Sequence, residues 1–131
     1  MNRKIIINFA ILTTLILASC SAQSPQFSIE QYEFSFGDVV NGTIVSKDLT
    51  INNTGGSPLI IETVSTSCGC TTAKIEPQSI SPGEQGVLHI EFDSGAHGPD
   101  LTGELIRQIF ITTNDPSNPE LIIQFSVNVT N

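Results

Sequence analysis

Two cysteines separated by a single glycine are the residues of this sequence whose type and spacing are best suited to chemistry. Cys68 and Cys70 lie in the run TVSTSCGCTTAKIEP, residues 63–77, which otherwise consists mainly of small and β-branched residues. Thiolates are nucleophiles and ligands for soft metal ions, and two thiols can close a disulfide. The pair therefore predicts a disulfide, a redox site or a metal site.

The spacing restricts how the two cysteines can be joined. In an extended strand, residues i and i+2 lie about 6.6–6.8 Å apart on one face. That is the upper limit of the roughly 4.4–6.8 Å between Cα atoms that a disulfide tolerates. We expect Gly69 to let the chain pucker so that the bond can form. We expect the small ring to be strained, which would make the bond labile rather than structural. The ring also closes almost no loop, so the bond would stabilise the fold little.

Three interpretations of the pair are open. In the first, the cysteines pack or form a disulfide that only shapes a tight turn. In the second, the pair cycles between dithiol and disulfide and exchanges with thiols of partner proteins, with Lys74 as the only cation near it in the sequence. In the third, Cys68 and Cys70 bind Cu or Zn with His89 or His97 as a further ligand. No other cofactor and no catalytic residue are indicated.

The third cysteine, Cys20, indicates where in the cell the protein is located. The chain begins MNRKIIINFAILTTLILASC, a basic start followed by an apolar run over residues 5–17 that is too short to span a bilayer and is typical of a signal peptide. The letters LASC, residues 17–20, resemble the bacterial lipobox, which implies removal of residues 1–19 and lipidation of Cys20. Because serine and not aspartate follows, we expect a lipid-anchored protein of the bacterial cell envelope, at the outer membrane facing the periplasm.

The net charge disfavours two kinds of partner. Removal of residues 1–19 leaves Lys47, Lys74 and Arg107 against thirteen acidic residues, a net charge of −10. Such a surface disfavours binding to nucleic acid and electrostatic docking on anionic lipid. The expected contacts are therefore the membrane, through the N-terminal lipid, and an unidentified protein of the envelope.

The rest of the chain predicts strands. Residues 20–30 are polar and carry Pro25, and we interpret them as the lipidated N-terminus and a tether. From residue 31 to residue 131, short β-rich runs alternate with Gly, Pro, Asn and Asp turns. Leu88, Ile90 and Phe92, for example, share one face of their run. The pattern predicts one domain, an all-β antiparallel immunoglobulin-like β-sandwich of about seven strands, over residues 31–37, 43–52, 58–65, 70–76, 84–92, 104–113 and 120–129.

The order of motifs resembles a bacterial family, domain of unknown function 1573. The shared elements are FSFGDV (34–39), NTG (53–55), SCGCT (67–71), ISPGE (80–84) and TNDP (113–116). The resemblance covers nearly the whole chain after the signal peptide. It implies an immunoglobulin-like sandwich on an exported or lipid-anchored protein, and it implies no particular activity.

Two functions follow from these observations. The first is a non-catalytic, lipid-anchored envelope domain that binds another protein or helps to assemble a complex, through its loops or sheet edges. The second is a redox-active or soft-metal-handling lipoprotein that uses Cys68 and Cys70. They differ in whether substitution of Cys68 removes a measurable chemistry or leaves partner binding intact.

Overall fold

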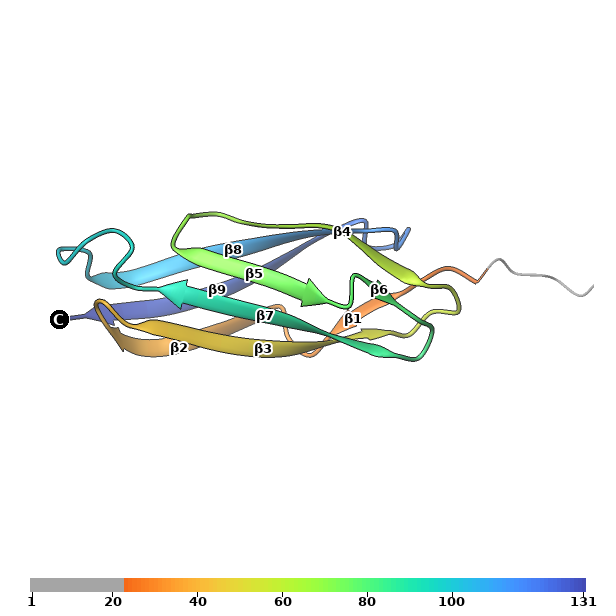
Figure 1. Cartoon of the computed structure of the whole chain (residues 1–131), viewed down its shortest axis with the longest axis horizontal. Helices are drawn as coiled ribbons and strands as arrows, with labels where there is room; N and C mark the ends of the chain where they lie inside the picture. Colours follow the sequence, from red (N-terminus) through yellow and green to blue (C-terminus); the bar gives the residue numbers. More distant parts are fainter. Residues whose placement is uncertain (1–22) are drawn as a thin grey trace, which may run out of the picture.

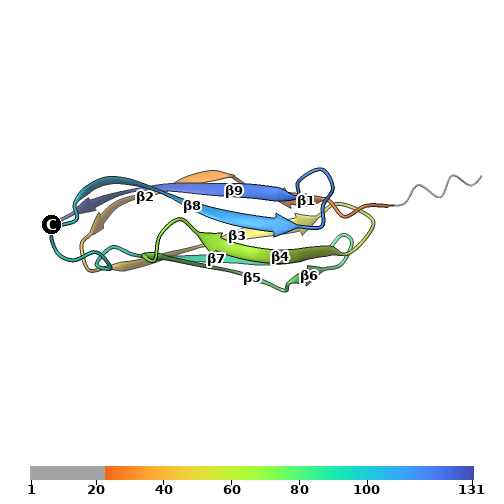
Figure 2. The ribbon, with the colours of Figure 1, turned by 90° about the horizontal axis from the view of Figure 1, so that it is seen from above.

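A computed structural model describes residues 23–131, so the predicted signal peptide and the lipidation site Cys20 lie outside the described residues. Two sheets face each other and form a β-sandwich, with strand orders β1-β3-β7-β5 and β2-β9-β8-β4-β6 (Figures 1 and 2). The all-β sandwich predicted from the sequence is confirmed. Residues 23–131 contain no helical segment that could span a bilayer.

The seven predicted strands are all present, and their ends differ from the predicted ones by at most three residues. The four-stranded sheet consists of β1 (Phe27–Ile29), β3 (Ile44–Asn53), β7 (Gln85–Asp93) and β5 (Thr71–Glu76). The five-stranded sheet consists of β2 (Glu33–Val40), β9 (Glu120–Thr130), β8 (Gly103–Thr113), β4 (Leu59–Thr66) and β6 (Ser79–Ile80).

The sandwich begins earlier than the sequence predicts. Residues 20–30 are predicted to be a tether, but β1 pairs with β3, and Phe27 and Ile29 are buried. Pro25 is buried as well. Three residues are too few to show a periodicity amid polar neighbours, so burial against β3 decides this strand and not its own pattern.

One pairing is parallel. Six of the seven strand pairings of the described residues are antiparallel, as predicted, whereas β2 runs parallel to β9. The chain leaves the four-stranded sheet after β1 and enters the other sheet at β2 within three residues. Alternation of apolar residues fixes the face that a strand buries but not the direction of its neighbour, so the sequence does not reveal this pairing.

The core consists of the inward-facing side chains of both sheets. On β7, Leu88, Ile90 and Phe92 are fully buried, as the alternation predicts. Each such side chain contributes about 1.5–3 kcal/mol through the apolar area that it removes from water. Other fully buried side chains come from β3, β4, β6, β8 and β9: Leu49, Ile51, Leu59, Ile80, Ile109, Ile111, Ile123, Phe125 and Val127.

Among the buried polar residues of the shared motifs, Asn53 and Asp115 hold loops in place through their side chains. Asn53, of the NTG turn, accepts hydrogen bonds from the N–H groups of Gln26 and Gly55 and donates to the carbonyl oxygens of Ser57 and Ile80. All the hydrogen-bonding capacity of the amide side chain is used, which offsets the cost of its burial.

Asp115, in the TNDP turn, holds the start of β1 in place through hydrogen bonds to its carboxylate. Its carboxylate accepts hydrogen bonds from the N–H of Phe27 at 2.9 Å, the N–H of Ser117 at 2.8 Å and the side-chain amide of Asn118 at 3.0 Å. Burial alone would raise the pKa of Asp115, but these hydrogen bonds lower it below its ordinary value.

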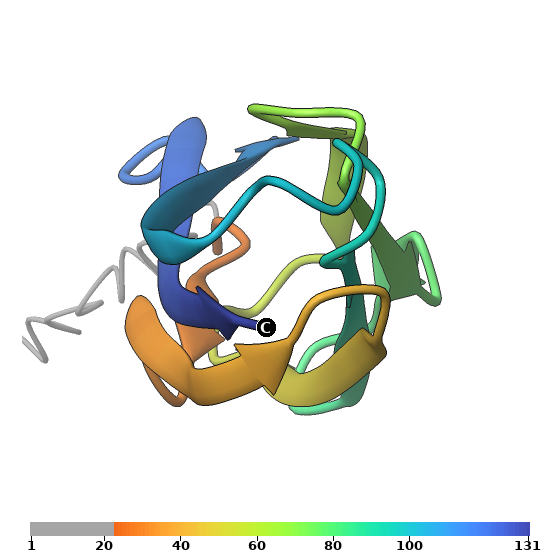
Figure 3. The same ribbon diagram turned by 90° about the vertical axis from the view of Figure 1, so that its left-hand side faces the viewer.

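The first described residues and the Cys68–Cys70 turn lie at opposite ends of the sandwich. The chain enters at residue 23 beside the turn after β3, where Gly56 donates to the carbonyl of Ser24. The other end of β3 begins at Ile44, opposite Asp93, whose N–H donates to the carbonyl of Cys70. Figures 1 and 3 show this far end, with the loop after β7 and the C-terminus. The ten residues of β3 separate the two ends, a distance of about 30 Å.

Candidate thiol–disulfide site

Cys68 and Cys70 form a disulfide within the turn that connects β4 to β5. Their Cα atoms lie 5.3 Å apart, inside the range that the bond tolerates. The turn is closed by the N–H of Thr71, which donates to the carbonyl of Cys68 at 3.3 Å. The hydroxyl of Thr66 donates to the carbonyl oxygens of Cys68 and Thr71, each at 3.0 Å. β-branched threonines at both ends of the turn thus fix the backbone that brings the sulfur atoms together.

Gly69 is not required in the way the sequence predicts. Its φ lies outside the left-handed region, and a Cβ added to it would meet nothing within 4 Å. The turn after Cys68, and not the special freedom of glycine, provides the close approach of the two cysteines. A small side chain at this position would project into open space.

The two cysteines differ in burial. Cys70 is 2% exposed and belongs to the hydrophobic core, whereas Cys68 is half-buried and packs against that core. A molecule that approaches from solvent can therefore reach Cys68 more easily than Cys70.

Each sulfur atom also has its own hydrogen-bond donor. The Nε of Arg107 donates to Cys70 Sγ at 3.2 Å, and the backbone N–H of Cys70 donates to Cys68 Sγ at 3.2 Å. The hydroxyl of Thr71 lies 3.6 Å from Cys68 Sγ and 3.8 Å from Cys70 Sγ. The donor at Cys70 carries a full positive charge, and charge-assisted hydrogen bonds to an ionised acceptor are about twice as strong as neutral ones.

Arg107 lies on the inner face of β8, between Leu105 and Ile109, and reaches across to the other sheet. Its Nη1 donates to the carbonyl of Ile106 at 2.9 Å. In the described part of the chain the ion pairs involve Lys74 and His89, and none involves Arg107. A half-buried guanidinium without a carboxylate partner is an electrostatic cost that an anion beside it would reduce.

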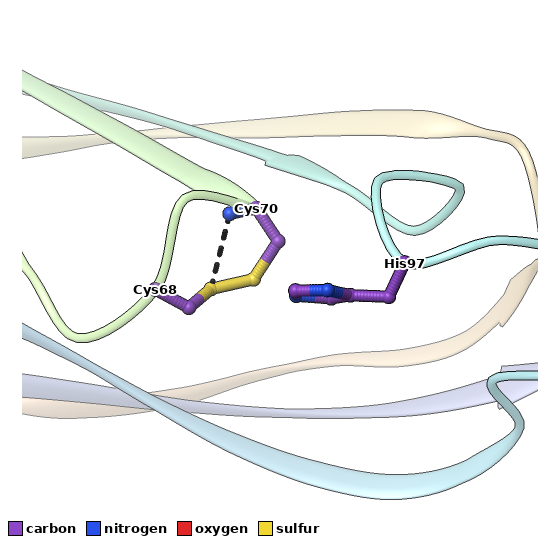
Figure 4. A group of neighbouring side chains, drawn as sticks. All are labelled: Cys68, Cys70 and His97. Carbon is purple, nitrogen blue, oxygen red and sulfur yellow. Dashed lines mark hydrogen bonds between the residues drawn. A yellow bond between two sulfur atoms is a disulfide. The ribbon is translucent and has the colours of Figure 1, made fainter.

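His97 completes the group. One ring nitrogen of His97 and the two sulfur atoms all lie within 4.8 Å of one another. Figure 4 shows the imidazole next to Cys70 Sγ, on the side away from Cys68 Sγ. The loop that carries His97 is fastened to the turn after β2, because the side-chain amide of Asn41 donates to the carbonyl oxygens of Gly98 and Leu101.

The other residues that the sequence singles out lie elsewhere. His89 is on the outer face of β7, where its Nδ1 lies 2.5 Å from a carboxylate oxygen of Asp48 and its Nε2 lies 3.7 Å from Glu91. Its hydrogen bond to Asp48 is the main cause of a raised pKa for His89. Lys74 pairs with Glu76 on the surface. Of the two predicted histidines the structure thus brings only His97 to the cysteines, and the cation beside them is Arg107.

Sequence reasoning missed Arg107, although a signal was present. In the run ELIRQIFITT the residues at Leu105, Ile109 and Ile111 share one face, and Arg107 falls on that same apolar face. A charged residue at an inward position indicates either a buried partner or a function. No signal in the sequence places His97, since its position depends on how the loop folds back.

A second surface stands apart from the cysteines. On the outer face of the five-stranded sheet Phe110 and Ile122 lie opposite each other on β8 and β9, and both are exposed. Ile106, on the same face of β8, is also exposed. A shallow hollow at Phe110 and Ile122 is further lined by Thr63, Ser65 and Glu120.

Two facing sheets with this strand order define an immunoglobulin-like, PapD-like β-sandwich. The chain belongs to the family described as "Protein of unknown function (DUF1573)", whose pattern matches residues 27–129. The resemblance found in the sequence is therefore confirmed. A comparison with curated proteins finds no match.

Solved structures share the fold. A protein of unknown function from Porphyromonas gingivalis W83 is 24% identical, with a TM-score of 0.75, over 87% of this chain and 51% of that one. This chain thus spans about half the length of that relative. The seventh PapD-like domain of human CEP192 is 14% identical, with a TM-score of 0.62, over 82% of this chain and 87% of that one. The chaperone YadV is 13% identical, with a TM-score of 0.53, over 79% of this chain and 50% of that one.

Proposed function

We propose that this protein is a lipid-anchored domain of the bacterial cell envelope that interacts with other envelope proteins by thiol–disulfide exchange at Cys68 and Cys70. The observation that carries the proposal is the contact of the Arg107 guanidinium with Cys70 Sγ at 3.2 Å. Because no carboxylate of the described residues pairs with this guanidinium, its charge is free to stabilise a thiolate formed when the disulfide opens.

The size of the ring supports an exchangeable bond. The cysteines are two positions apart, so the disulfide removes little chain entropy from the unfolded state and contributes little to stability. The turn is held independently by the hydrogen bonds of Thr66 and Thr71. The fold therefore does not depend on the bond, and opening the disulfide leaves the surrounding strands in place.

The place of the site in the fold is in keeping with an anchor at Cys20. Cys20 precedes residue 23 by three positions, and residue 23 lies at the end of the sandwich opposite the Cys68–Cys70 turn. A lipid at Cys20 would place the turn on the side of the domain away from the membrane. An oxidising compartment outside the cytoplasm would keep the pair as a disulfide until a partner thiol arrives.

A second candidate is a binding domain without exchange, as first expected from the sequence. The exposed side chains of Ile106, Phe110 and Ile122 on one sheet face favour it, because apolar side chains gathered on a surface mark contact sites. The fold is also that of the chaperones YadV and SfaE. This function requires nothing of the cysteines.

Metal binding is a third outcome. Cys68, Cys70 and His97 form a group that could hold a soft ion such as Cu(I) or Zn(II) once the disulfide is reduced. The guanidinium of Arg107 beside Cys70 opposes a cation there, so the group suits a thiolate better than a metal.

The proposal is tested on full-length protein purified from membranes in detergent. We expect Cys68 and Cys70 to be oxidised as isolated, to react with a thiol reagent after mild reduction, and to contain no stoichiometric metal by elemental analysis. The mass of the N-terminal peptide should correspond to a diacylglycerol-modified Cys20. Cys68→Ser should abolish exchange and leave the far-ultraviolet circular dichroism spectrum unchanged. A pair that resists mild reduction in the folded protein, or an unmodified N-terminus, would refute the corresponding half of the proposal.

A further inference from the structure

The structure assigns a direction to this exchange: the incoming thiolate attacks Cys68 Sγ, and Cys70 leaves as a thiolate held by Arg107. The inference rests on the proposed function, because it names the roles of the residues within that exchange. In the first step a partner thiolate forms a bond to Cys68 Sγ, the Cys68–Cys70 bond breaks, and its electron pair remains on Cys70 Sγ. In the second step another thiolate of the partner attacks the partner sulfur that is bonded to Cys68. The partner becomes a disulfide, and Cys68 leaves as a thiolate that takes a proton from water.

Burial is the first argument. An attacking thiolate must reach the sulfur, and the rate of exchange depends on that access. Cys70 is 2% exposed, whereas Cys68 is half-buried at the surface of the turn. Of the two cysteines, the more accessible to a protein partner is therefore Cys68.

The line of approach is the second argument. Substitution at a disulfide sulfur proceeds with the nucleophile opposite the leaving sulfur. For attack on Cys70 Sγ, that line lies on the side away from Cys68. The His97 imidazole lies on that side of Cys70 Sγ (Figure 4), within 4.8 Å. His97 therefore covers the path to Cys70 and leaves Cys68 as the target.

Charge is the third argument. The leaving sulfur develops the negative charge, and a better stabilised thiolate leaves faster. Cys70 Sγ accepts from the charged guanidinium of Arg107, whereas Cys68 Sγ accepts from a neutral backbone N–H. The charge of Arg107 offsets the cost of forming a thiolate at the buried Cys70 and favours departure from Cys70, in agreement with the better access to Cys68 and with the position of His97.

The adduct formed with reduced glutathione tests the direction. Full-length oxidised protein is mixed with glutathione, quenched with acid and N-ethylmaleimide, and digested. Fragment masses on either side of Gly69 then locate glutathione on one cysteine and maleimide on the other. We expect glutathione on Cys68 and maleimide on Cys70 in at least about a ten-fold excess over the reverse. An equal or reversed distribution overturns the assigned direction while leaving exchange itself established, whereas no adduct and no reduction contradicts the proposed function.

Substitution of Arg107 tests the origin of the preference. Arg107→Gln keeps a donor but removes the charge, and the rate of reduction by glutathione should fall about ten-fold. Arg107→Lys should restore most of the rate, which a purely structural role for the side chain would not explain. Lys74→Gln, which removes a cation of the neighbouring surface paired with Glu76, is the matched control and should leave the rate unchanged. Equal rates for Arg107→Gln and the control would contradict the role of the guanidinium, and the adduct position tests the direction even if that variant fails to fold.

Discussion

Removal of the Asp115 carboxylate should uncouple the start of the sandwich from the turn between β8 and β9. Asp115 is 1% exposed, and it connects residues far apart in the sequence, since it accepts from the N–H of Phe27 as well as from Ser117 and Asn118. Asp115→Ala leaves all three donors without this acceptor. The bond to Phe27 is buried, whereas those to Ser117 and Asn118 are partly exposed, so that water can replace them in part.

The magnitude follows from these three donors. An unsatisfied buried donor costs about 1–3 kcal/mol, and partly exposed donors cost less. We therefore expect Asp115→Ala to lower the free energy of unfolding by about 2–4 kcal/mol. Asp115→Asn, which retains one carbonyl oxygen as an acceptor, should cost less than the alanine substitution. Asp100→Ala, in an exposed loop, is the control and should change stability by less than about 0.5 kcal/mol.

The pH dependence of the free energy of unfolding tests the role of the Asp115 carboxylate independently. The pKa of Asp115 is lowered in the folded protein, so the stabilisation by its carboxylate is complete above the pKa of the unfolded state. That stabilisation is lost as the pH falls through the folded-state pKa. Urea unfolding of the natural protein and of Asp115→Asn should therefore differ most at neutral pH and progressively less below 3.8, the ordinary value. A cost for Asp115→Ala below about 1 kcal/mol, or a difference that grows on acidification, would refute this reasoning.

Three further outcomes are expected. Gly69→Ala should retain the disulfide by mass spectrometry and unfold at the same urea concentration, because a Cβ there meets nothing within 4 Å; a loss of the bond would contradict this. The His89 imidazole should titrate above 6.5 by NMR, and Asp48→Asn should lower the pKa of His89. This variant should destabilise the protein more below the unfolded-state pKa of His89 than above its raised folded-state pKa. An unchanged titration would show that the hydrogen bond to Asp48 does not raise the pKa. Ile122→Ser should leave the rate of exchange with glutathione unchanged. If the exposed sheet face binds proteins, this variant should capture less of the partner protein. Undiminished capture would exclude that face as the binding site.

Regular alternation made most of the fold predictable from the sequence. In β7 every second residue is buried, and turn residues with a restricted or permissive φ bound each run. β1 was not predicted, since three residues show no periodicity and their burial depends on pairing with β3. The parallel direction of β2 against β9 depends on where the chain crosses between sheets, which local patterns do not encode.

The candidate site was predictable only in part. The sequence left a disulfide, a redox pair and a metal site open for Cys68 and Cys70, and the structure contains the disulfide. Arg107 and His97 come to the pair from β8 and from the loop after β7, at sequence separations that no local motif spans. The expected cation, Lys74, is close in sequence but points to the surface and pairs with Glu76. Tertiary contacts, and not sequence proximity, thus determine the electrostatics of the cysteines.

The reduction potential of the Cys68–Cys70 disulfide in the folded full-length protein decides whether the bond can exchange with a partner thiol. The protein is equilibrated in glutathione buffers of graded potential, quenched by alkylation and analysed by mass spectrometry. The pair should be half-reduced at a potential above about −300 mV, in the range of exchangeable disulfides. A pair that stays oxidised below that potential until the protein is unfolded would show that the bond is structural and that it does not exchange in the folded protein.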